Sequence, residues 1–469
     1  MSEINTDDLI TKEGVNAESN GKNEEDINKG WKHALKEHSL PEVYGSIKVP
    51  GSRSSFWRKM LAFAGPGMLV AVGYMDPGNW ATDIAGGAQF GYTLLTVILI
   101  SNIFAMVLQH LAVKLGVVSG RDLAQACRDN YSKPVSFVLW VLCEIAIAAT
   151  DLAEVIGSAI ALNLLFGIPL VVGVILTAAD VLVILYFQNK GFRYVESIVA
   201  GMIFIILGCF VYEIIVSNPE IGPMLTGLIP DPQIAINPAM LYIAIGILGA
   251  TVMPHNLYLH SSIVQTRKYE KTNEGKKMAI KFATIDSSAS LFLAFFINAA
   301  ILIVAAATFH NTGYQEVADI SDAYMLLTPL LGAKFASIAF AVALLASGQN
   351  STLTGTLAGQ IVMEGFLNIR LKPWLRRLIT RMIAIIPAVI VTILMGERGA
   401  GSLLILSQVI LSIQLSFAVF PLISFTSDKL KMGGFVNSPR LKVIVYTIGY
   451  IIAFLNIYLL IQTFVEWFQ

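Results

Sequence analysis

Eleven apolar segments of membrane-spanning length are the feature that most limits how this chain can fold. A helix needs about 20 mainly apolar residues to cross the hydrocarbon core of a bilayer. Only 14% of the residues are charged, against about 25% in soluble domains. We therefore expect an all-α polytopic membrane protein with eleven transmembrane helices. The segments lie near residues 60–90, 92–117, 134–160, 167–187, 195–216, 239–265, 280–308, 335–366, 378–396, 402–427 and 441–466.

The loops between these segments differ in charge. Lys and Arg cluster before the first segment and in every second loop after it, whereas the intervening loops contain only Lys334 and Arg398. Cytoplasmic loops of membrane proteins carry an excess of Lys and Arg. The pattern therefore predicts a multi-pass protein of the cell membrane with a cytoplasmic N-terminus and an extracellular C-terminus.

Residues 1–55 differ in composition from the rest of the chain. They are polar, carry both signs of charge and contain no apolar core of a signal peptide. Such a composition is typical of segments that cannot bury enough apolar surface to fold. We expect a mostly disordered cytoplasmic tail, with a short helix near Trp31 to His38, followed by one transmembrane domain over residues 56–466.

The first apolar segment is interrupted in its middle by Asp76-Pro77-Gly78-Asn79. A charged side chain at membrane depth is costly and faces a cavity or a partner. Pro and Gly disturb the helical hydrogen bonds, which is tolerated only where the freed backbone lines a polar site. This stretch therefore predicts a broken membrane helix with an oxygen ligand at the break.

The sixth segment has a matching interruption at Met253-Pro254-His255. The first and sixth segments correspond if the chain contains two repeats of five helices, followed by an eleventh helix. Because five is odd, the second repeat is then inverted relative to the first. Inverted repeats with broken helices in matching positions are typical of secondary transporters. The repeats would span about residues 56–216 and 239–428, and the eleventh helix about 441–466.

The side chains at the two breaks suit a transition-metal ion. Asp76 and Asn79 offer oxygen ligands, and Met253 offers a thioether sulfur. The carbonyl of Ala250 lacks its usual helical partner because Pro254 has no N–H. Mg²⁺ and Ca²⁺ prefer shells made only of oxygen, whereas Mn²⁺ and Fe²⁺ accept a mixed set. We expect such an ion as the substrate, and no resident cofactor.

Ionisable side chains also occur within other membrane segments. Acidic and basic groups strung through a helix bundle are typical of a proton route, although a structural salt-bridge network is the alternative. Histidine is suited to proton exchange near neutral pH. The candidates for proton transfer and gating are Glu144, Asp151 and Glu154 in the third segment, His255 after the second break, and Arg376 and Arg377 at the start of the ninth.

These motifs together resemble the Nramp divalent-metal transporters, and among them the bacterial proton-coupled manganese transporters. The resemblance covers about residues 56–466, and its combination of motifs is specific. The motifs that carry it are Asp76-Pro77-Gly78-Asn79, Ala250-Thr251-Val252-Met253-Pro254-His255-Asn256, Gly348-Gln349-Asn350-Ser351-Thr352, Asp151-Leu152-Ala153-Glu154 and Ser407-Gln408-Val409.

The resemblance implies a LeuT-like fold and symport of Mn²⁺ or Fe²⁺ with protons into the cytoplasm by alternating access. It implies that Asp76, Asn79, Ala250 and Met253 bind the ion and that Gln408 approaches it in some states. It also implies that the ionisable residues named above carry the proton-transfer and gating roles of the family. Family relatives that carry Mg²⁺ or Al³⁺ lack the methionine, so Met253 argues against those substrates.

Three other functions would require residues that differ from those of a metal transporter. A sodium-coupled organic-solute symporter of the same fold would have small hydroxyl residues at the first break instead of Asp76. An intramembrane metalloenzyme would show the HExxH spacing, which His255 and His260 do not have. A metal sensor without transport would need a signalling domain, and we expect none here. We expect protons and the lipid bilayer as partners, and no nucleic acid or obligatory protein partner.

Overall fold

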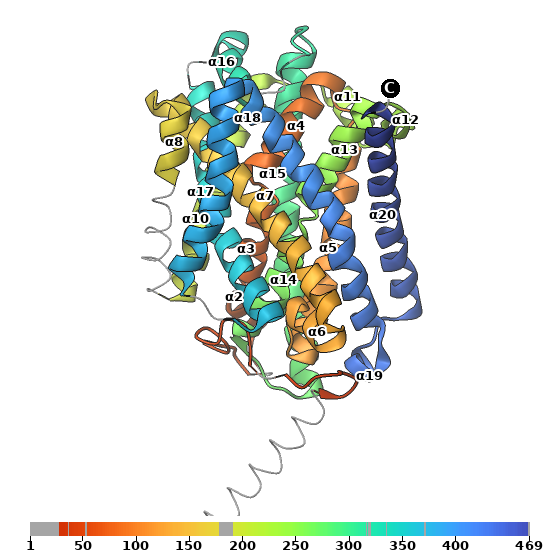
Figure 1. Cartoon of the computed structure of the whole chain (residues 1–469). Coiled ribbons are helices and arrows are strands. Elements are labelled where there is room, and N and C mark those ends of the chain that lie inside the picture. Colours follow the sequence, from red (N-terminus) through yellow and green to blue (C-terminus); the bar gives the residue numbers. More distant parts are fainter. Residues whose placement is uncertain are drawn as a thin grey trace, which may run out of the picture.

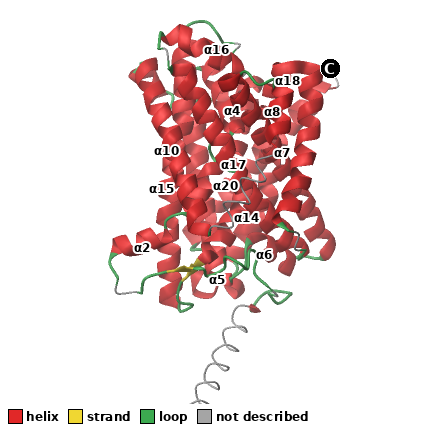
Figure 2. Ribbon diagram, turned by 90° about the vertical axis from the view of Figure 1, so that its left-hand side faces the viewer, coloured by secondary structure: helices red, strands yellow, loops and turns green. Residues whose placement is uncertain are grey.

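The computed structural model shows a bundle of long helices that run roughly along one direction (Figures 1 and 2). Short helices and loops cover both ends of the bundle, and two short strands lie at the lower end. The structure describes residues 28–35, 37–51, 54–177, 191–315, 317, 320–333, 335–369 and 372–467.

The described elements fall on both sides of the connection at residues 218–237. Those before it are β1 (Ile47–Lys48), α2 (Phe56–Phe63), α3 (Pro66–Gly73), α4 (Pro77–Phe90), α5 (Leu95–Ser119), α6 (Leu123–Asn130), α7 (Lys133–Phe166), α8 (Leu170–Leu176) and α10 (Phe192–Ser217). The connection holds α11 (Ile221–Thr226) and α12 (Gln233–Ile236). Those after it are α13 (Pro238–Thr251), α14 (Pro254–Ile263), η2 (Val264–Thr266), β2 (Arg267–Lys268), α15 (Asn273–Ala305), η3 (Ala306–His310), α16 (Ile320–Leu331), α17 (Ala336–Leu367), α18 (Pro373–Ser427), α19 (Lys429–Met432), η4 (Gly433–Phe435) and α20 (Pro439–Trp467).

Within the described residues, 7 helical stretches are long and apolar enough to cross a membrane. The other predicted segments have identifiable reasons for not being among them. The first is divided into short helices, the fourth extends beyond the described residues, and the eighth, α17, carries many polar side chains. The ninth is continuous with the tenth. The total of eleven spans therefore stays a prediction.

The predicted ninth and tenth segments lie in one continuous helical element, α18, which has 55 residues. At 1.5 Å per residue, a straight helix of this length would be about 80 Å long, far more than the roughly 30 Å hydrocarbon core. Figure 1 shows that α18 bends near the upper end of the bundle. Two passes through the bundle are thus joined without the loop that the sequence predicts.

The first apolar segment is interrupted twice, whereas the sequence analysis predicted one break. The additional break separates α2 from α3 at Ala64 and Gly65, where Gly65 has a φ of 132° that favours glycine. Arg193 and Arg267 each donate a hydrogen bond of 2.7 Å to the carbonyl oxygen of Ala64. Arginine side chains thus satisfy a backbone acceptor that the break leaves without a helical partner.

Part of the segment before α2 differs from the prediction of a mostly disordered tail, whereas residues 1–27 lie outside the described residues. Residues 28–35 and 37–51 lie against the lower end of the bundle, and Ser39, Leu40 and Ile47 are buried there. The predicted helix near Trp31 to His38 is absent, since the described residues of that stretch form bends and irregular backbone. The sequence analysis missed this packing because the segment has too few apolar residues to form a core of its own.

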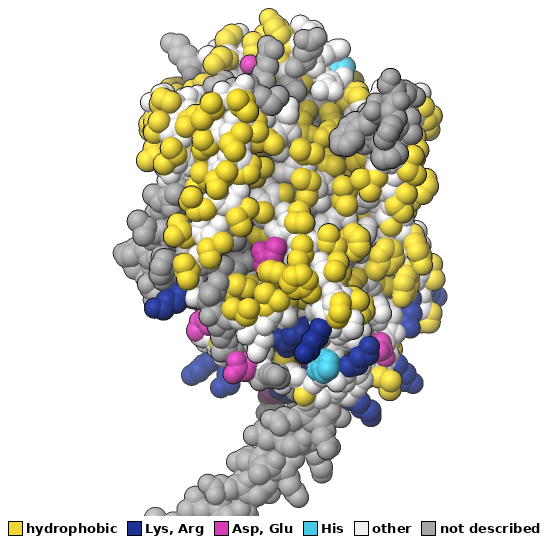
Figure 3. Space-filling model, viewed as in Figure 1, with side chains coloured by type: hydrophobic (Ala, Val, Ile, Leu, Met, Phe, Trp, Pro, Cys, Tyr) yellow, Lys and Arg dark blue, Asp and Glu magenta, His cyan; other side chains and the backbone are white. Residues whose placement is uncertain are grey.

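The surface of the bundle matches a protein surrounded by lipid. Hydrophobic side chains cover the middle and upper parts of the face shown in Figure 3. Lys and Arg side chains gather at the lower end of that face. An apolar belt with charged groups at one end is what a bilayer and its cytoplasmic surface select.

Candidate functional site

The first candidate element is the break between α3 and α4. Asp76 is the N-cap of α4, and its Oδ1 accepts a 2.8 Å hydrogen bond from the backbone N–H of Asn79. Pro77 occupies the first position of α4, where a missing N–H costs nothing. Asp76 and Asn79 are both buried. The positive end of the α4 dipole therefore stabilises a carboxylate inside the bundle.

Side chains from other helices satisfy the backbone that this break exposes. The carbonyl oxygen of Tyr74 accepts hydrogen bonds from the side-chain amides of Asn79 and, at 2.7 Å, of Asn298 on α15. The carbonyl oxygen of Met75 accepts from the Trp80 indole at 3.3 Å and from the Ser347 hydroxyl on α17. Unpaired carbonyls in an apolar interior are costly, so these contacts hold the unwound segment in one conformation.

The second break separates α13 from α14. The α13 helix ends at Thr251, and α14 begins at Pro254 with Met253 as its N-cap. Ala250 lies in the last turn of α13, so its carbonyl has no helical N–H from Pro254 to accept. Ala250 and Met253 are buried. Met253 packs with Ala146 and Ala149 of α7 and with Leu411 of α18.

Gln408 of α18 is the residue that connects the two breaks. Its Nε2 lies 3.5 Å from Oδ2 of Asp76, and a Cβ atom added to Gly78 would lie 1.6 Å from the same nitrogen. A Cβ atom added to Gly249, beside Ala250, would lie 2.2 Å from the Gln408 carbonyl oxygen. The sequence analysis gave Gln408 only a conditional role, but the fold places it against both broken helices.

The polar atoms at this junction include buried acceptors without a partner. In the part of the chain that the structure describes, Oδ1 of Asn79 and Oε1 of Gln408 make no hydrogen bond. An unsatisfied buried oxygen is costly unless it serves a ligand. No group of three or more His, Cys, Asp and Glu side chains that could hold a metal ion occurs among the described residues. The donor set here is instead one carboxylate, two amide oxygens, a carbonyl and a thioether.

The carboxylates of α7 lie beside α17. Glu154 is fully buried and accepts 3.1 Å hydrogen bonds from the hydroxyls of Ser351 and Thr352. It also lies within electrostatic range of Asp76. A row of hydroxyls thus faces a buried carboxylate next to the first break.

The other candidates for proton transfer have different surroundings. Asp151 is fully buried and within electrostatic range of His255. The Nδ1 of His255 makes no hydrogen bond to the residues described here. Glu144 is only half-buried, and its Oε1 accepts a 3.1 Å hydrogen bond from the Trp140 indole. The side chains of Arg376 and Arg377 lie outside the described residues.

Several residues of this region were missed by the sequence analysis. Asn298 and Ser347 hold the first break from α15 and α17. A chain of buried hydrogen bonds runs from the Tyr74 hydroxyl through Gln109, at 2.9 Å, to Nδ1 of His260, at 2.9 Å. A polar side chain in the middle of an apolar segment was the available signal for these residues. Nothing in the sequence indicated that the partners of Asn298 and Ser347 were backbone atoms of the break.

The bundle resembles solved transporters. A manganese transporter from Eremococcus coleocola, in complex with an aromatic bis-isothiourea substituted compound, aligns with a TM-score of 0.83 and 43% identity over 90% of each chain. The nucleobase-cation-symport-1 family transporter Mhp1 aligns with a TM-score of 0.57 at 15% identity, which concerns the fold alone. The predicted LeuT-like fold is therefore confirmed. Two broken helices that meet in the middle of this fold define a secondary transporter.

Sequence comparisons give the family. Residues 67–462 match the family model described as Natural resistance-associated macrophage protein-like, or Nramp. The divalent metal cation transporter MntH of Listeria innocua is 65% identical over 92% of this chain and 96% of its own length. The MntH of Nostoc is 65% identical over 92% and 97%. The chain belongs to the Nramp family, and it is a membrane transporter rather than an enzyme.

The close approach of α18 to Gly249 gives a stability prediction. We expect Gly249→Ala to lower the melting temperature of the detergent-purified protein by several degrees, because the new methyl group would overlap backbone and Ser412 atoms of α18. Gly208→Ala on α10 is the matched control, since a Cβ atom there meets no atom within 4 Å. Equal melting temperatures for the two variants would contradict the close packing at Gly249.

Proposed function

We propose that this chain is a proton-coupled symporter that carries Mn²⁺ or Fe²⁺ into the cytoplasm by alternating access. The observation that carries the proposal is the meeting of both helix breaks at Gln408. There the buried carboxylate of Asp76 contacts Asn79 and Gln408, whose side-chain oxygens make no hydrogen bond to the described residues. The names of the similar proteins, which refer to divalent metal and manganese transport, support the same function.

We assign the ion to Asp76, Asn79, Ala250, Met253 and Gln408. Asp76 supplies the negative charge, the amides and the Ala250 carbonyl supply neutral oxygens, and Met253 supplies the sulfur. A thioether adds little affinity for Mn²⁺ but disfavours Ca²⁺ and Mg²⁺, so it acts by discrimination. In the structure the Met253 side chain packs against α7 and α18, and the proposal is that its sulfur faces the ion beside Asp76.

We propose that protons travel through the α7 carboxylates. Glu154 is close enough to Asp76 to respond to the charge of the ion, and Asp151 lies within electrostatic range of His255. A carboxylate that binds a cation must be deprotonated, so metal entry and proton transfer become coupled. Glu144, Arg376 and Arg377 complete this proposed route toward the cytoplasm.

We place the protein in the plasma membrane, with the N-terminus and the basic end of the bundle in the cytoplasm and the C-terminus outside. The alternation of basic loops and the cluster of Lys and Arg in Figure 3 support this orientation. The division into repeats at about 56–216 and 239–428 belongs to the same proposal. We propose further that transport needs no resident cofactor and no obligatory protein partner.

The function is tested by Mn²⁺ flux into proteoliposomes under an inward proton gradient. We expect the wild type to take up Mn²⁺ and Asp76→Ala to reduce uptake by about 100-fold, as the loss of about 3 kcal/mol of binding would. Asp231→Ala, an exposed carboxylate of the loop before α12, should transport normally. No Mn²⁺ uptake by the wild type would favour a sensor. Uptake of an organic solute that depends on Na⁺ would favour the other symporter class.

The role of the sulfur is tested by competition. We expect Met253→Ala to retain Mn²⁺ uptake while Ca²⁺ competes about tenfold better, a change of about 1.4 kcal/mol in discrimination. Met240→Ala, a buried methionine of α13 away from the break, serves as the control. Unchanged exclusion of Ca²⁺ by the Met253 variant would show that the sulfur does not select the ion.

Proton coupling is tested at Glu154. We expect Glu154→Gln to bind Mn²⁺ with nearly normal affinity but to lose most of the acidification of the vesicle interior that accompanies uptake. A pH-sensitive dye inside the vesicles measures this ratio. Glu213→Gln removes another fully buried carboxylate, on α10, and should leave the ratio unchanged. A normal proton-to-metal ratio in the Glu154 variant would refute the route.

A further inference from the structure

The N-terminal strap, whose described residues are 28–35 and 37–51, packs on the end of the bundle that is assigned to the cytoplasm. The hydroxyl of Ser39 donates a 2.6 Å hydrogen bond to Oδ2 of Asp122, the N-cap of α6. The guanidinium of Arg121 donates to Oδ1 of Asn28 at 2.7 Å and stacks over the Trp31 ring at 4.7 Å. These contacts fasten the strap to the loop between α5 and α6.

The hydrogen bond to Asp122 is the shortest of these contacts. Burial raises the pKa of Asp122 to about 6, while the hydrogen bonds from Ser39 and from backbone amides oppose that rise. The Ser39 hydroxyl thus stabilises the ionised form of Asp122, to which its hydrogen bond is charge-assisted. Breaking it would leave a buried carboxylate with fewer donors, which is costly.

The same strap also contacts the second half of the bundle. The backbone N–H of Leu40 donates a 3.1 Å hydrogen bond to Oε2 of Glu364 on α17. Strand β1 pairs in parallel with β2, so Ile47 lies beside Arg267. The Trp31 ring also packs against Phe425 near the end of α18, with 5.4 Å between centroids. The strap thus spans both halves at the end assigned to the cytoplasm.

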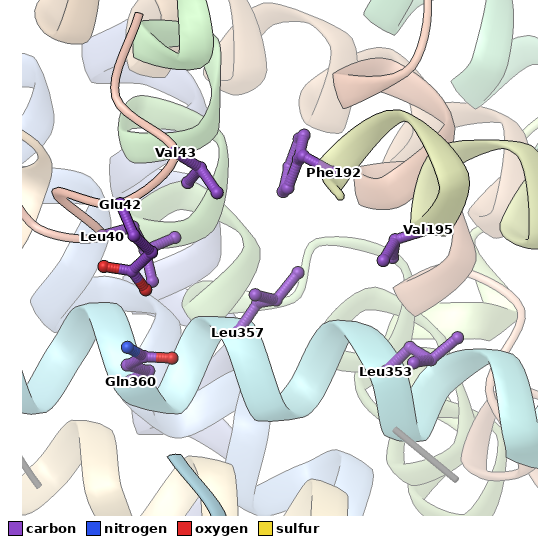
Figure 4. Close-up of a pocket in the computed structure, with 8 residues that line it drawn as sticks. All are labelled: Leu40, Glu42, Val43, Phe192, Val195, Leu353, Leu357 and Gln360. Atoms are coloured by element: carbon purple, nitrogen blue, oxygen red, sulfur yellow. The ribbon is translucent and has the colours of Figure 1, made fainter. Parts of the chain in front are cut away.

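Between these anchors, the strap covers an apolar crevice between α10 and α17. Figure 4 shows Leu40 and Val43 of the strap across from Phe192, Val195, Leu353 and Leu357. A cavity of about 80 Å³ remains beneath the strap. Leu357 is 6% exposed, and Leu40 is 3% exposed. The strap therefore shields apolar side chains that would otherwise border an opening on this side.

The backbone at Leu40 carries strain that only strong anchoring explains. Its φ is 51°, a left-handed conformation that side chains with a Cβ atom rarely adopt. Such conformations persist where the surrounding contacts over-determine them. Here the N–H is held by Glu364 and the side chain by the crevice. Leu40 is thus the central anchor of the strap.

The strap is also linked to the first broken helix. The backbone of Arg267 pairs with Ile47. The Arg267 guanidinium donates a hydrogen bond to the carbonyl oxygen of Ala64, between α2 and α3, and pairs with Oε1 of Glu196 on α10 at 2.6 Å. The strap continues directly into α2 along the chain. Release of the strap would therefore loosen the inner half of the first broken helix in two ways, through Arg267 and through the chain itself.

We propose that the N-terminal strap is a lock on the cytoplasmic side of the transporter. It covers the crevice between α10 and α17 in the conformation described here. It must leave Asp122 and Glu364 before the inner half of the first broken helix moves away. The assignment of this side to the cytoplasm rests on the proposed function. The lock itself concerns which conformation the protein adopts, whatever ion is transported.

The test measures how fast a cysteine beneath the strap is reached from the cytoplasmic side. Leu357→Cys is introduced after the 3 native cysteines have been replaced by alanine, and a membrane-impermeant maleimide is applied to inside-out vesicles. Leu40→Asp releases the strap by placing a carboxylate beside Glu364 and in the apolar crevice. Ser46→Asp adds the same charge at an exposed strap residue and is the matched control.

We expect Leu40→Asp to accelerate labelling by about tenfold or more, while Ser46→Asp labels at the rate of the unmodified strap. A synthetic peptide of residues 28–51 should slow the labelling of the Leu40→Asp variant again. If Leu40→Asp does not fold, Trp31→Ala provides the released strap. Equal rates in the released, control and unmodified proteins would overturn the lock. Labelling does not require metal transport, so failure of the lock and failure of the proposed function are distinguishable.

Discussion

The structure depends on how backbone polar groups are satisfied where two membrane helices are interrupted. Pro77 and Pro254 provide no N–H, so each break exposes carbonyl oxygens in an interior without water. At the first break, Asn79, Asn298, Trp80 and Ser347 donate to these carbonyls. These hydrogen bonds therefore hold the break and the surrounding helices in place relative to each other.

Small residues line the site where the helices approach each other closely. Gly78 and Gly249 have no space for a methyl group because α18 approaches both breaks, and Gly157 on α7 approaches Pro77 in the same way. Close packing of small residues is how membrane helices gain van der Waals contact in the absence of a hydrophobic driving force between them. The glycines thus bring Gln408 to the carboxylate of Asp76, and the site forms between helices that are distant in sequence.

The lower end of the bundle (Figure 1) shows the opposite arrangement, in which ion pairs take the place of apolar packing. Arg267, Glu196 and Arg193 are joined by ion pairs at the junction of α2, α10 and β2, and Arg267 and Glu196 are almost fully buried. Buried ion pairs contribute little net stability, but a pair that loses one partner leaves a buried charge at a large cost. A transporter needs contacts that form fully in one state and are absent in the other. Strap and ion pairs lie together where such a switch would act.

The sequence by itself determined the membrane class, the approximate segments, the two central breaks and the residue types at them, because these depend on local composition and on proline chemistry. It also sufficed to expect Asp76, Asn79 and Met253 at the site. Only the tertiary structure decided that Gln408 contacts both breaks, that Ser351 and Thr352 face Glu154, and that residues 28–51 pack on the bundle. The physical reason is that these contacts join segments separated by up to several hundred residues. No local propensity or periodicity reports which distant backbone atom or carboxylate a polar side chain will meet.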